Sequence, residues 1–125
     1  MTNVKYMLLI YETPKDFAAR TGDKSAPYVA AWRAYHESMV DAGVFVGGDP
    51  LQPVDTATTL RVQGGRRHVQ DGPYADTKEQ LGGNIVLELP SLDAAMDWAS
   101  RCPAAQSGAV EIRPLASDMR QRIVS

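Results

Sequence analysis

The sequence predicts an α+β fold, a ferredoxin-like sandwich with an inserted β-hairpin. Two amphipathic helical segments alternate with apolar strand-like segments, in the order β-α-β-hairpin-β-α-β. The chain has 125 residues, of which 44% are hydrophobic and 22% charged. These values are typical of one globular domain with a single core. We therefore expect residues 1–125 to form a single domain.

The first half of the chain predicts a strand, a loop and a helix. Val4 to Tyr11 is apolar at nearly every position, which indicates a strand covered on both faces. Thr13 to Ser25 is polar and predicts a loop long enough to act as a flap. A helix should then begin near Pro27 and end at Gly43. Its apolar stripe consists of Tyr28, Trp32, Tyr35, Met39 and Ala42.

The second half predicts a hairpin, a second helix and further strands. Gly64 and Gly65 suit a tight hairpin turn. Ser91 is a good N-cap for a helix with one apolar face, and Gly108 precedes the last strand. The strands are predicted over Val44 to Gly48, Ala57 to Gln63, Arg66 to Gln70, Asn84 to Leu89 and Ala109 to Pro114.

Composition argues against several classes of partner. The net charge of −2 and a pI near 5.6 leave no basic excess for nucleic acid. The cluster Arg66-Arg67-His68 is better explained as a solvated hairpin end. No segment is apolar enough for a bilayer, and the single Cys102 forms no intrachain disulfide. We therefore expect a cytoplasmic protein that binds neither membranes nor nucleic acid.

The segment from Asp71 to Gly83 (DGPYADTKEQLGG) is the most distinctive part of the chain. Asp71, Gly72 and Pro73 predict a sharp turn, because proline fixes its own φ and restricts the residue before it. Together with the ending GAVEIRPL, this segment resembles the DGPF-type proteins of the bacterial YCII-related family. Tyr74 stands where those proteins commonly carry phenylalanine. The resemblance implies the predicted fold, a homodimer that forms a dimeric α+β barrel, and a candidate pocket.

The predicted fold itself favours a second copy of the chain. Both helices cover the same face of the sheet, and the other face would be larger and more apolar than a monomer normally exposes. The two-sided apolar character of Val4 to Tyr11 agrees with a covering sheet. We therefore expect a homodimer.

Three residues of the distinctive segment are candidates for chemistry. Asp71 would act as an acid or base at a strand end, or would only accept backbone hydrogen bonds in its turn. Tyr74 would line a substrate pocket or fill the core. Lys78 would bind an anionic substrate or remain a solvated charge. The spacing of Asp76 and Glu79 matches a capping box and predicts a helical turn over Thr77 to Leu81.

The first helix and the strands carry the remaining candidates. His36 lies beside the apolar stripe, where it would be a half-buried general base or a packing residue, and Trp32 would contact the substrate. The resemblance implies a His/Asp acid–base pair, but His36 does not align with the family's histidine relative to Gly43. His68 lies three residues before Asp71, so their side chains should point to opposite faces of a strand.

Charged residues on the strands predict an interface network, and no motif predicts a metal or cofactor. Arg61, Glu111 and Arg113 interrupt apolar strands and would form a salt-linked ring, which would fix the register of the interface or bind a polar ligand between the sheets of a dimer. The chain's two histidines and one cysteine have no metal-ligand spacing. Its glycine pairs lack the context of a nucleotide-binding loop. We therefore expect neither a metal nor a cofactor.

Two classes of function follow from these observations. The first is a cofactor-independent enzyme for a small polar or aromatic metabolite, with a pocket between the first helix and the sheet, closed by the Thr13 to Ser25 loop. Asp71 would then be its acid or base. The second is a non-catalytic binding or regulatory module, since DGPF-type proteins are often encoded near extracytoplasmic-function sigma factors. A shifted pKa near a closed pocket would favour the first class, and an exposed apolar patch the second.

Overall fold

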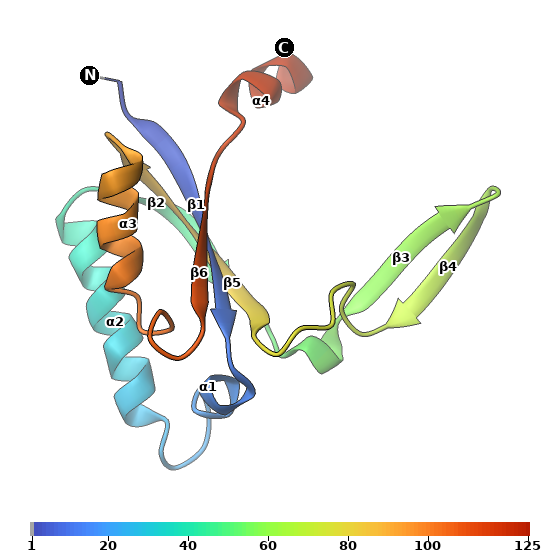
Figure 1. Ribbon diagram of the computed structural model, residues 1–125, viewed down its shortest axis with the longest axis horizontal. Helices are drawn as coiled ribbons and strands as arrows, with labels where there is room; N and C mark the ends of the chain where they lie inside the picture. The colour runs from blue at the N-terminus through green and yellow to red at the C-terminus, as the bar shows by residue number, and fades with distance from the viewer. Residues whose placement is uncertain (1) are drawn as a thin grey trace.

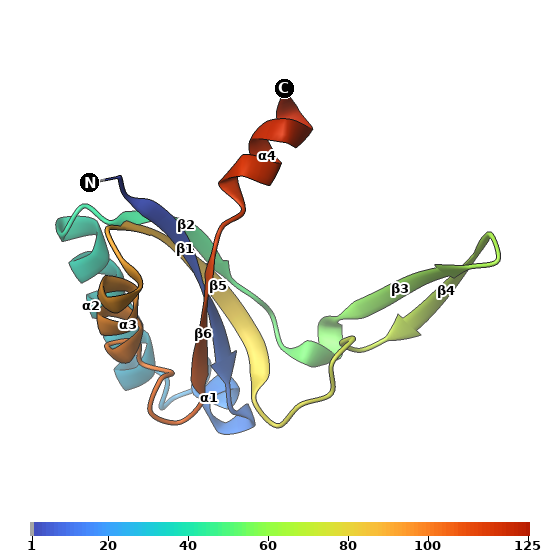
Figure 2. The same cartoon turned by 45° about the horizontal axis from the view of Figure 1, so that its top comes forward.

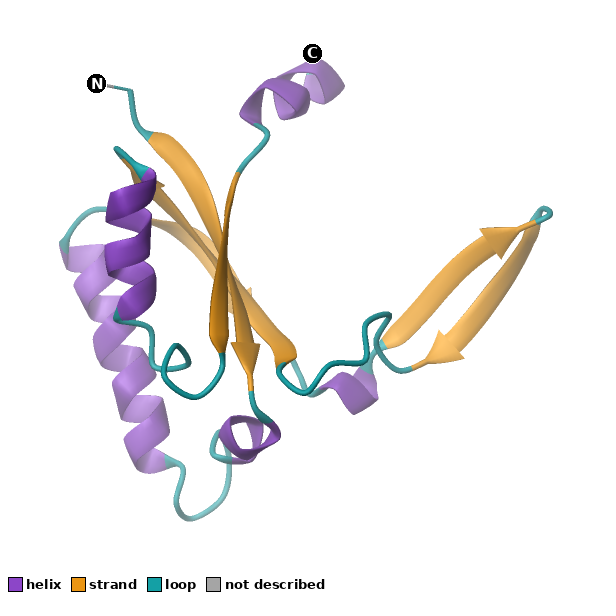
Figure 3. Cartoon of the chain, in the orientation of Figure 1, coloured by secondary structure: helices purple, strands orange, loops and turns teal. Residues whose placement is uncertain are grey.

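The computed structural model describes residues 2–125, which form a four-stranded antiparallel sheet with two long helices on one face (Figures 1 and 3). The strand order is β2-β5-β1-β6, and every neighbouring pair is antiparallel. This is the order of a ferredoxin-like sandwich, so the predicted fold class is confirmed. The strands are β1 (Val4–Glu12), β2 (Phe45–Pro50), β5 (Gln80–Leu89) and β6 (Ala109–Pro114), and the helices are α2 (Ala26–Asp41) and α3 (Leu92–Ser100).

The core lies between this sheet and α2 and α3. Alternate residues of β1 point into it, because successive side chains of a strand face opposite sides. Tyr6, Leu8 and Ile10 are buried there, together with Leu87 of β5 and Met39 of α2. The residues between them on β1 face the other side of the sheet and are only partly buried.

Both long helices begin and end where the sequence predicts. The Ser91 hydroxyl accepts a hydrogen bond from the Ala94 amide at 3.1 Å, which caps α3. Gly43 follows α2 with a φ of +73°, a conformation that glycine adopts without steric cost. The Tyr35 hydroxyl donates to the Trp98 carbonyl at 2.8 Å and joins the two helices.

Strands β3 (Thr58–Gln63) and β4 (Arg66–Asp71) form the predicted hairpin, which we call the arm. Gly64 and Gly65 have φ values of +57° and +74°, as the central residues of a type I′ turn require. The short helix η1 (Val54–Thr56) precedes the arm. The arm forms a separate two-stranded sheet and projects away from the sandwich (Figures 1 and 2).

Four details differ from the sequence predictions. The predicted loop after β1 contains a short helix, α1 (Pro14–Ala18), which is capped by the Thr13 hydroxyl. No helical turn forms over Thr77 to Leu81, because β5 already begins at Gln80. A terminal helix, α4 (Ser117–Val124), was not predicted. Arg61 lies on the arm, in a different sheet from Glu111 and Arg113, so the described residues of one chain do not form the salt-linked ring, and its formation between copies stays a prediction.

Cys102 is buried, as predicted, and its environment disfavours a thiolate. Desolvation by burial raises the pKa of the thiol to about 11, so the thiol stays protonated at neutral pH.

No helix among residues 2–125 has both the length and the hydropathy needed to cross a membrane.

Two adjacent glycines of β2 allow a matched test of how closely β2 approaches β5. A Cβ atom on Gly48 would lie 2.2 Å from the Asn84 carbonyl oxygen, and Gly48 also has a φ of +137°. Gly47 has neither constraint. We expect Gly48→Ala to lower the free energy of unfolding by about 2 kcal/mol or more, and Gly47→Ala to change it by less than about 0.5 kcal/mol. Urea denaturation of both variants measures this, and equal losses would contradict the close approach of β2 to β5.

Candidate functional site

A cavity of about 610 Å³ lies between α2 and the β2–β5 edge of the sheet. Its wall on α2 includes Tyr28, Trp32 and His36. Backbone without side chains forms part of the opposite wall, at Gly48 on β2 and at Gly82 and Gly83 on β5. An aromatic wall facing a glycine surface leaves a slot that suits a flat, mainly apolar ligand.

The last residue of β1 places a carboxylate in this cavity. Glu12 is only 2% exposed and forms an ion pair with Arg20. Arg20 Nη2 donates to Glu12 Oε1, and Arg20 Nε donates to Oε2 at 3.4 Å. The Tyr28 hydroxyl donates to Oε2 at 2.5 Å. These three donors leave about one of the roughly four lone-pair positions of the carboxylate for another partner.

Tyr28 is the member of this cluster that comes from α2. Its side chain is half-buried, and burial, followed by the hydrogen bond to Glu12, raises the pKa of its hydroxyl above the usual 10.0. The phenol therefore stays protonated near neutral pH and donates to Glu12. Its oxygen can also accept a hydrogen bond from a ligand, so Tyr28 can connect a ligand hydroxyl to the buried carboxylate.

Arg20 joins the cavity to the segment that follows β1. We call residues 13–25 the lid segment. From this segment Arg20 donates to the Gly82 carbonyl of β5 at 2.9 Å and to the Leu51 carbonyl after β2. Its guanidinium also lies 4.2 Å from the centre of the Phe17 ring. The lid segment is therefore fixed at one end of the cavity, where the sequence predicted a flap.

Two of the predicted site residues line the cavity. Trp32 packs edge-on against Tyr28, with ring centres 6.3 Å apart. His36 packs edge-on against Phe45 of β2, with ring centres 4.8 Å apart. Trp32 is half-buried and His36 is exposed, so His36 lies at the rim. Neither contacts Glu12 by a hydrogen bond among the described residues.

The other three predicted site residues lie outside the lining of this cavity. Asp71 is exposed at the end of the arm strand β4, opposite Thr58. Tyr74 is 75% exposed, and the Arg61 guanidinium lies 5.0 Å from its ring centre. Lys78 is exposed just before β5. Within one chain, Asp71, Tyr74 and Lys78 are therefore not brought together with the α2 residues of the cavity. The acid–base role of Asp71 stays a prediction.

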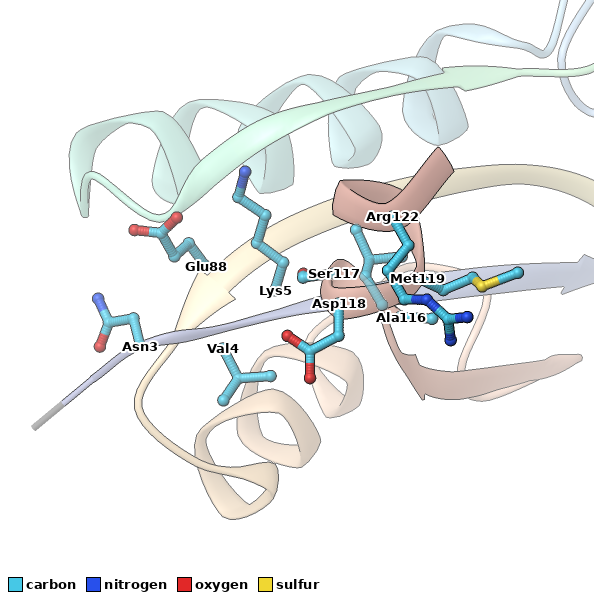
Figure 4. A pocket seen from close by; sticks show the side chains of 10 residues that line it. Asn3, Val4, Lys5, Glu88, Ala116, Ser117, Asp118, Met119 and Arg122 are labelled. Carbon is cyan, nitrogen blue, oxygen red and sulfur yellow. The ribbon is translucent and has the colours of Figure 1, made fainter. Parts of the chain in front are cut away.

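A second cavity, of about 630 Å³, lies where β1 begins and β5 ends, beside α4 (Figure 4). Its lining mixes charges of both signs from the sheet and from α4. Lys5 and Glu88 are cross-strand partners, and Asp118 and Arg122 come from α4. It has no aromatic wall, so the first cavity is the better candidate for a ring-shaped ligand. No cluster of three or more His, Cys, Asp or Glu suited to a metal occurs in residues 2–125.

Sequence reasoning missed Glu12 and Arg20. Glu12 carries a usable signal, because it continues the two-residue alternation of Tyr6, Leu8 and Ile10 and must therefore point into the core. A charged residue at a core position is unusual unless it is paired. No local pattern identifies Arg20, because its partners lie on β1, on β5 and after β2.

These features define a small α+β sandwich with an aromatic-walled cavity and a buried carboxylate. The sequence model of the YCII-related domain matches residues 4–117, and the chain belongs to this family. It is 34% identical over 113 residues to an uncharacterized protein of Rhizobium meliloti (strain 1021), covering 89% of this chain and 91% of that protein.

The fold is shared with a solved structure. It is the 5-chloro-2-hydroxyhydroquinone dehydrochlorinase TftG from Burkholderia phenoliruptrix AC1100, in complex with 2,5-dihydroxybenzoquinone. The two chains are 18% identical, with a TM-score of 0.50, and the match covers 87% of this chain and 90% of that one. At this identity the likeness concerns the fold alone.

Two arginines of the cavity allow a test of the ion pair. Arg20→Met leaves the Glu12 carboxylate buried without its counter-charge and should lower the free energy of unfolding by about 1–3 kcal/mol. This range allows for the 23% exposure of Arg20. Arg33→Met, at an exposed arginine of the same cavity, should change it by less than about 0.5 kcal/mol. Guanidinium denaturation measures the free energy of unfolding of both variants. An unchanged value for Arg20→Met would contradict the stabilising role of the ion pair.

Proposed function

We propose that the chain is a cofactor-independent enzyme that removes a proton from a small hydroxylated ring compound bound in the α2 cavity. The observation that carries the proposal is the buried Glu12 carboxylate, which reaches the cavity through the hydroxyl of Tyr28. A carboxylate within hydrogen-bonding distance of a positioned hydroxyl is a usual arrangement for general acid–base catalysis.

The proton would pass in two coupled transfers. A hydroxyl group of the bound ring gives its proton to the Tyr28 oxygen, and Tyr28 gives its own proton to Glu12. The substrate is left as an anion, Tyr28 is again a neutral phenol, and Glu12 carries the transferred proton. Arg20 keeps its hydrogen bonds to the Gly82 and Leu51 carbonyls throughout, so the site does not collapse as the charge of Glu12 changes.

The shape of the cavity supports a planar substrate. Trp32 of α2 provides an apolar wall, and Gly48 and Gly83 leave space opposite it, beside Phe45 of β2. The hydroxylated rings named for TftG and its bound compound fit this description and suggest the compound class to test first. Within this site Trp32 would contact the ring, and His36 would contact polar groups at the rim.

We also propose that two copies pair through the open face of the sheet. Met7 and Leu9 of β1 and Val86 of β5 lie on that face and are partly exposed. Around them lie charges of both signs, which a twofold interface needs because each patch meets a copy of itself. These are Lys5, Glu88, Glu111 and Arg113. The single buried Cys102 supports a reducing compartment such as the cytoplasm.

Hydrogen–deuterium exchange into ring compounds tests the proposed chemistry without knowledge of the full reaction. Proton NMR in D₂O would follow the ring hydrogens of dihydroxybenzenes and dihydroxybenzoquinones with the protein present. We expect at least one compound to exchange faster with the parent, and Glu12→Gln and Tyr28→Phe to slow this exchange about 100-fold or more. Asp71→Asn should keep the parent rate if the α2 cavity of one chain is sufficient.

Two outcomes would contradict this assignment. If Glu12→Gln retains the parent rate while Asp71→Asn loses it, the acid–base group is Asp71 and the α2 cavity is not the site. If no compound exchanges faster with the parent, and none of them raises its melting temperature, the cavity does not process this class of ring.

Sedimentation velocity tests the sheet pairing. We expect a dimer at micromolar concentration and a monomer for Leu9→Arg, because the substitution places a charge at the centre of the apolar patch. Thr2→Arg, at an exposed position outside the sheet, serves as the control and should remain dimeric. A monomeric parent at micromolar concentration would contradict the proposal.

A further inference from the structure

The arm exposes an apolar face that none of residues 2–125 covers. Leu60, Val62 and Val69 are 54%, 65% and 62% exposed. Leu60 and Val69 are direct cross-strand partners, and Val62, whose own partner is Arg67, lies two residues from Leu60, so all three apolar residues share one face. The arm is a two-stranded hairpin outside the main sheet, and such hairpins are at best marginally stable in water. An arm with this composition therefore requires a partner surface.

The opposite face of the arm is polar and basic. Arg61 and His68 are cross-strand partners there, as are Gln63 with Arg66 and Thr59 with Gln70. The arm is thus amphipathic across its two faces. A hairpin of this kind can pack its apolar face on a protein surface while its polar face remains in water.

Charge complementarity favours a second copy of this chain as the partner. The arm carries Arg61, Arg66 and Arg67 against Asp71, a net charge of +2. The rest of the chain carries the remaining −4 of the overall −2. A basic arm and an acidic body attract each other between copies, which favours association of like chains.

The position of the arm agrees with this partner. The arm and α4 both extend to the side of the sheet away from α2 and α3, on either side of the open face (Figure 2). A second copy placed on the open face would therefore lie within reach of the arm. Its own arm would reach back by the same twofold symmetry.

We propose that each arm packs its Leu60, Val62 and Val69 face on the body of a second copy seated on the open sheet face. The inference rests on the sheet pairing proposed above and extends it. The arm then contributes to dimer affinity, and the region around Asp71 and Tyr74 belongs to a contact between copies.

Adjacent residues of β4 provide matched variants of the full chain. Val69→Glu and Gln70→Glu add the same charge to opposite faces of the arm. Sedimentation equilibrium should show the dimer dissociation constant raised about tenfold or more by Val69→Glu, and changed less than about threefold by Gln70→Glu. Circular dichroism should show the same helix and strand content in both variants, because the arm lies outside the core.

Amide hydrogen exchange of the parent separates the arm contact from the sheet pairing. Exchange of the arm amides should slow about tenfold or more above the dissociation constant compared with the diluted monomer. A dimer whose arm amides exchange equally fast at both concentrations would overturn the arm contact and leave the sheet pairing intact. A parent that stays monomeric would overturn both, and equal effects of Val69→Glu and Gln70→Glu would overturn the assignment of the apolar face.

Discussion

The ion pair between Glu12 and Arg20 is the interaction on which the architecture of the cavity depends. A carboxylate that is almost fully buried needs a counter-charge and hydrogen bonds, since an unpaired buried charge costs several kcal/mol. Arg20 provides the counter-charge, and Tyr28 provides a further hydrogen bond. Because Glu12 ends β1, this requirement brings the lid segment and α2 to the end of the central strand.

The same arginine extends this constraint to the other side of the cavity. Its guanidinium donates to the Gly82 carbonyl on β5 and to the Leu51 carbonyl, which precedes the arm. Gly82 lies directly against this ion pair, because a Cβ atom there would meet the Glu12 carboxylate and would lie 2.9 Å from Arg20 Nη2. One side chain therefore holds the lid segment, β1, β5 and the start of the arm connection in a common arrangement.

Local patterns predicted the sandwich because each of its elements has its own signal. The alternation in β1, the Ser91 cap and the Gly64-Gly65 turn each depend on neighbouring residues, and all three appear in the structure. The cavity depends on residues distant in sequence, such as Arg20 and Gly82, and no local pattern joins them. Trp32 and His36 were found because a helix face can be read from spacing. The distinctive turn at Asp71 directed attention to the arm, which lies outside the cavity of its own chain.

The structure has a feature of each of the two functional classes considered. Tyr28 has a raised pKa beside a cavity, as a catalytic site would. The arm has an exposed apolar face, as a partner surface would. The two features lie on different parts of the chain, so they do not compete: the cavity belongs to the sandwich, and the arm leaves the sandwich through the connection that begins at Leu51. Because Arg20 holds that carbonyl and also neutralises Glu12, the connection to the arm and the buried carboxylate of the cavity belong to one hydrogen-bonded cluster.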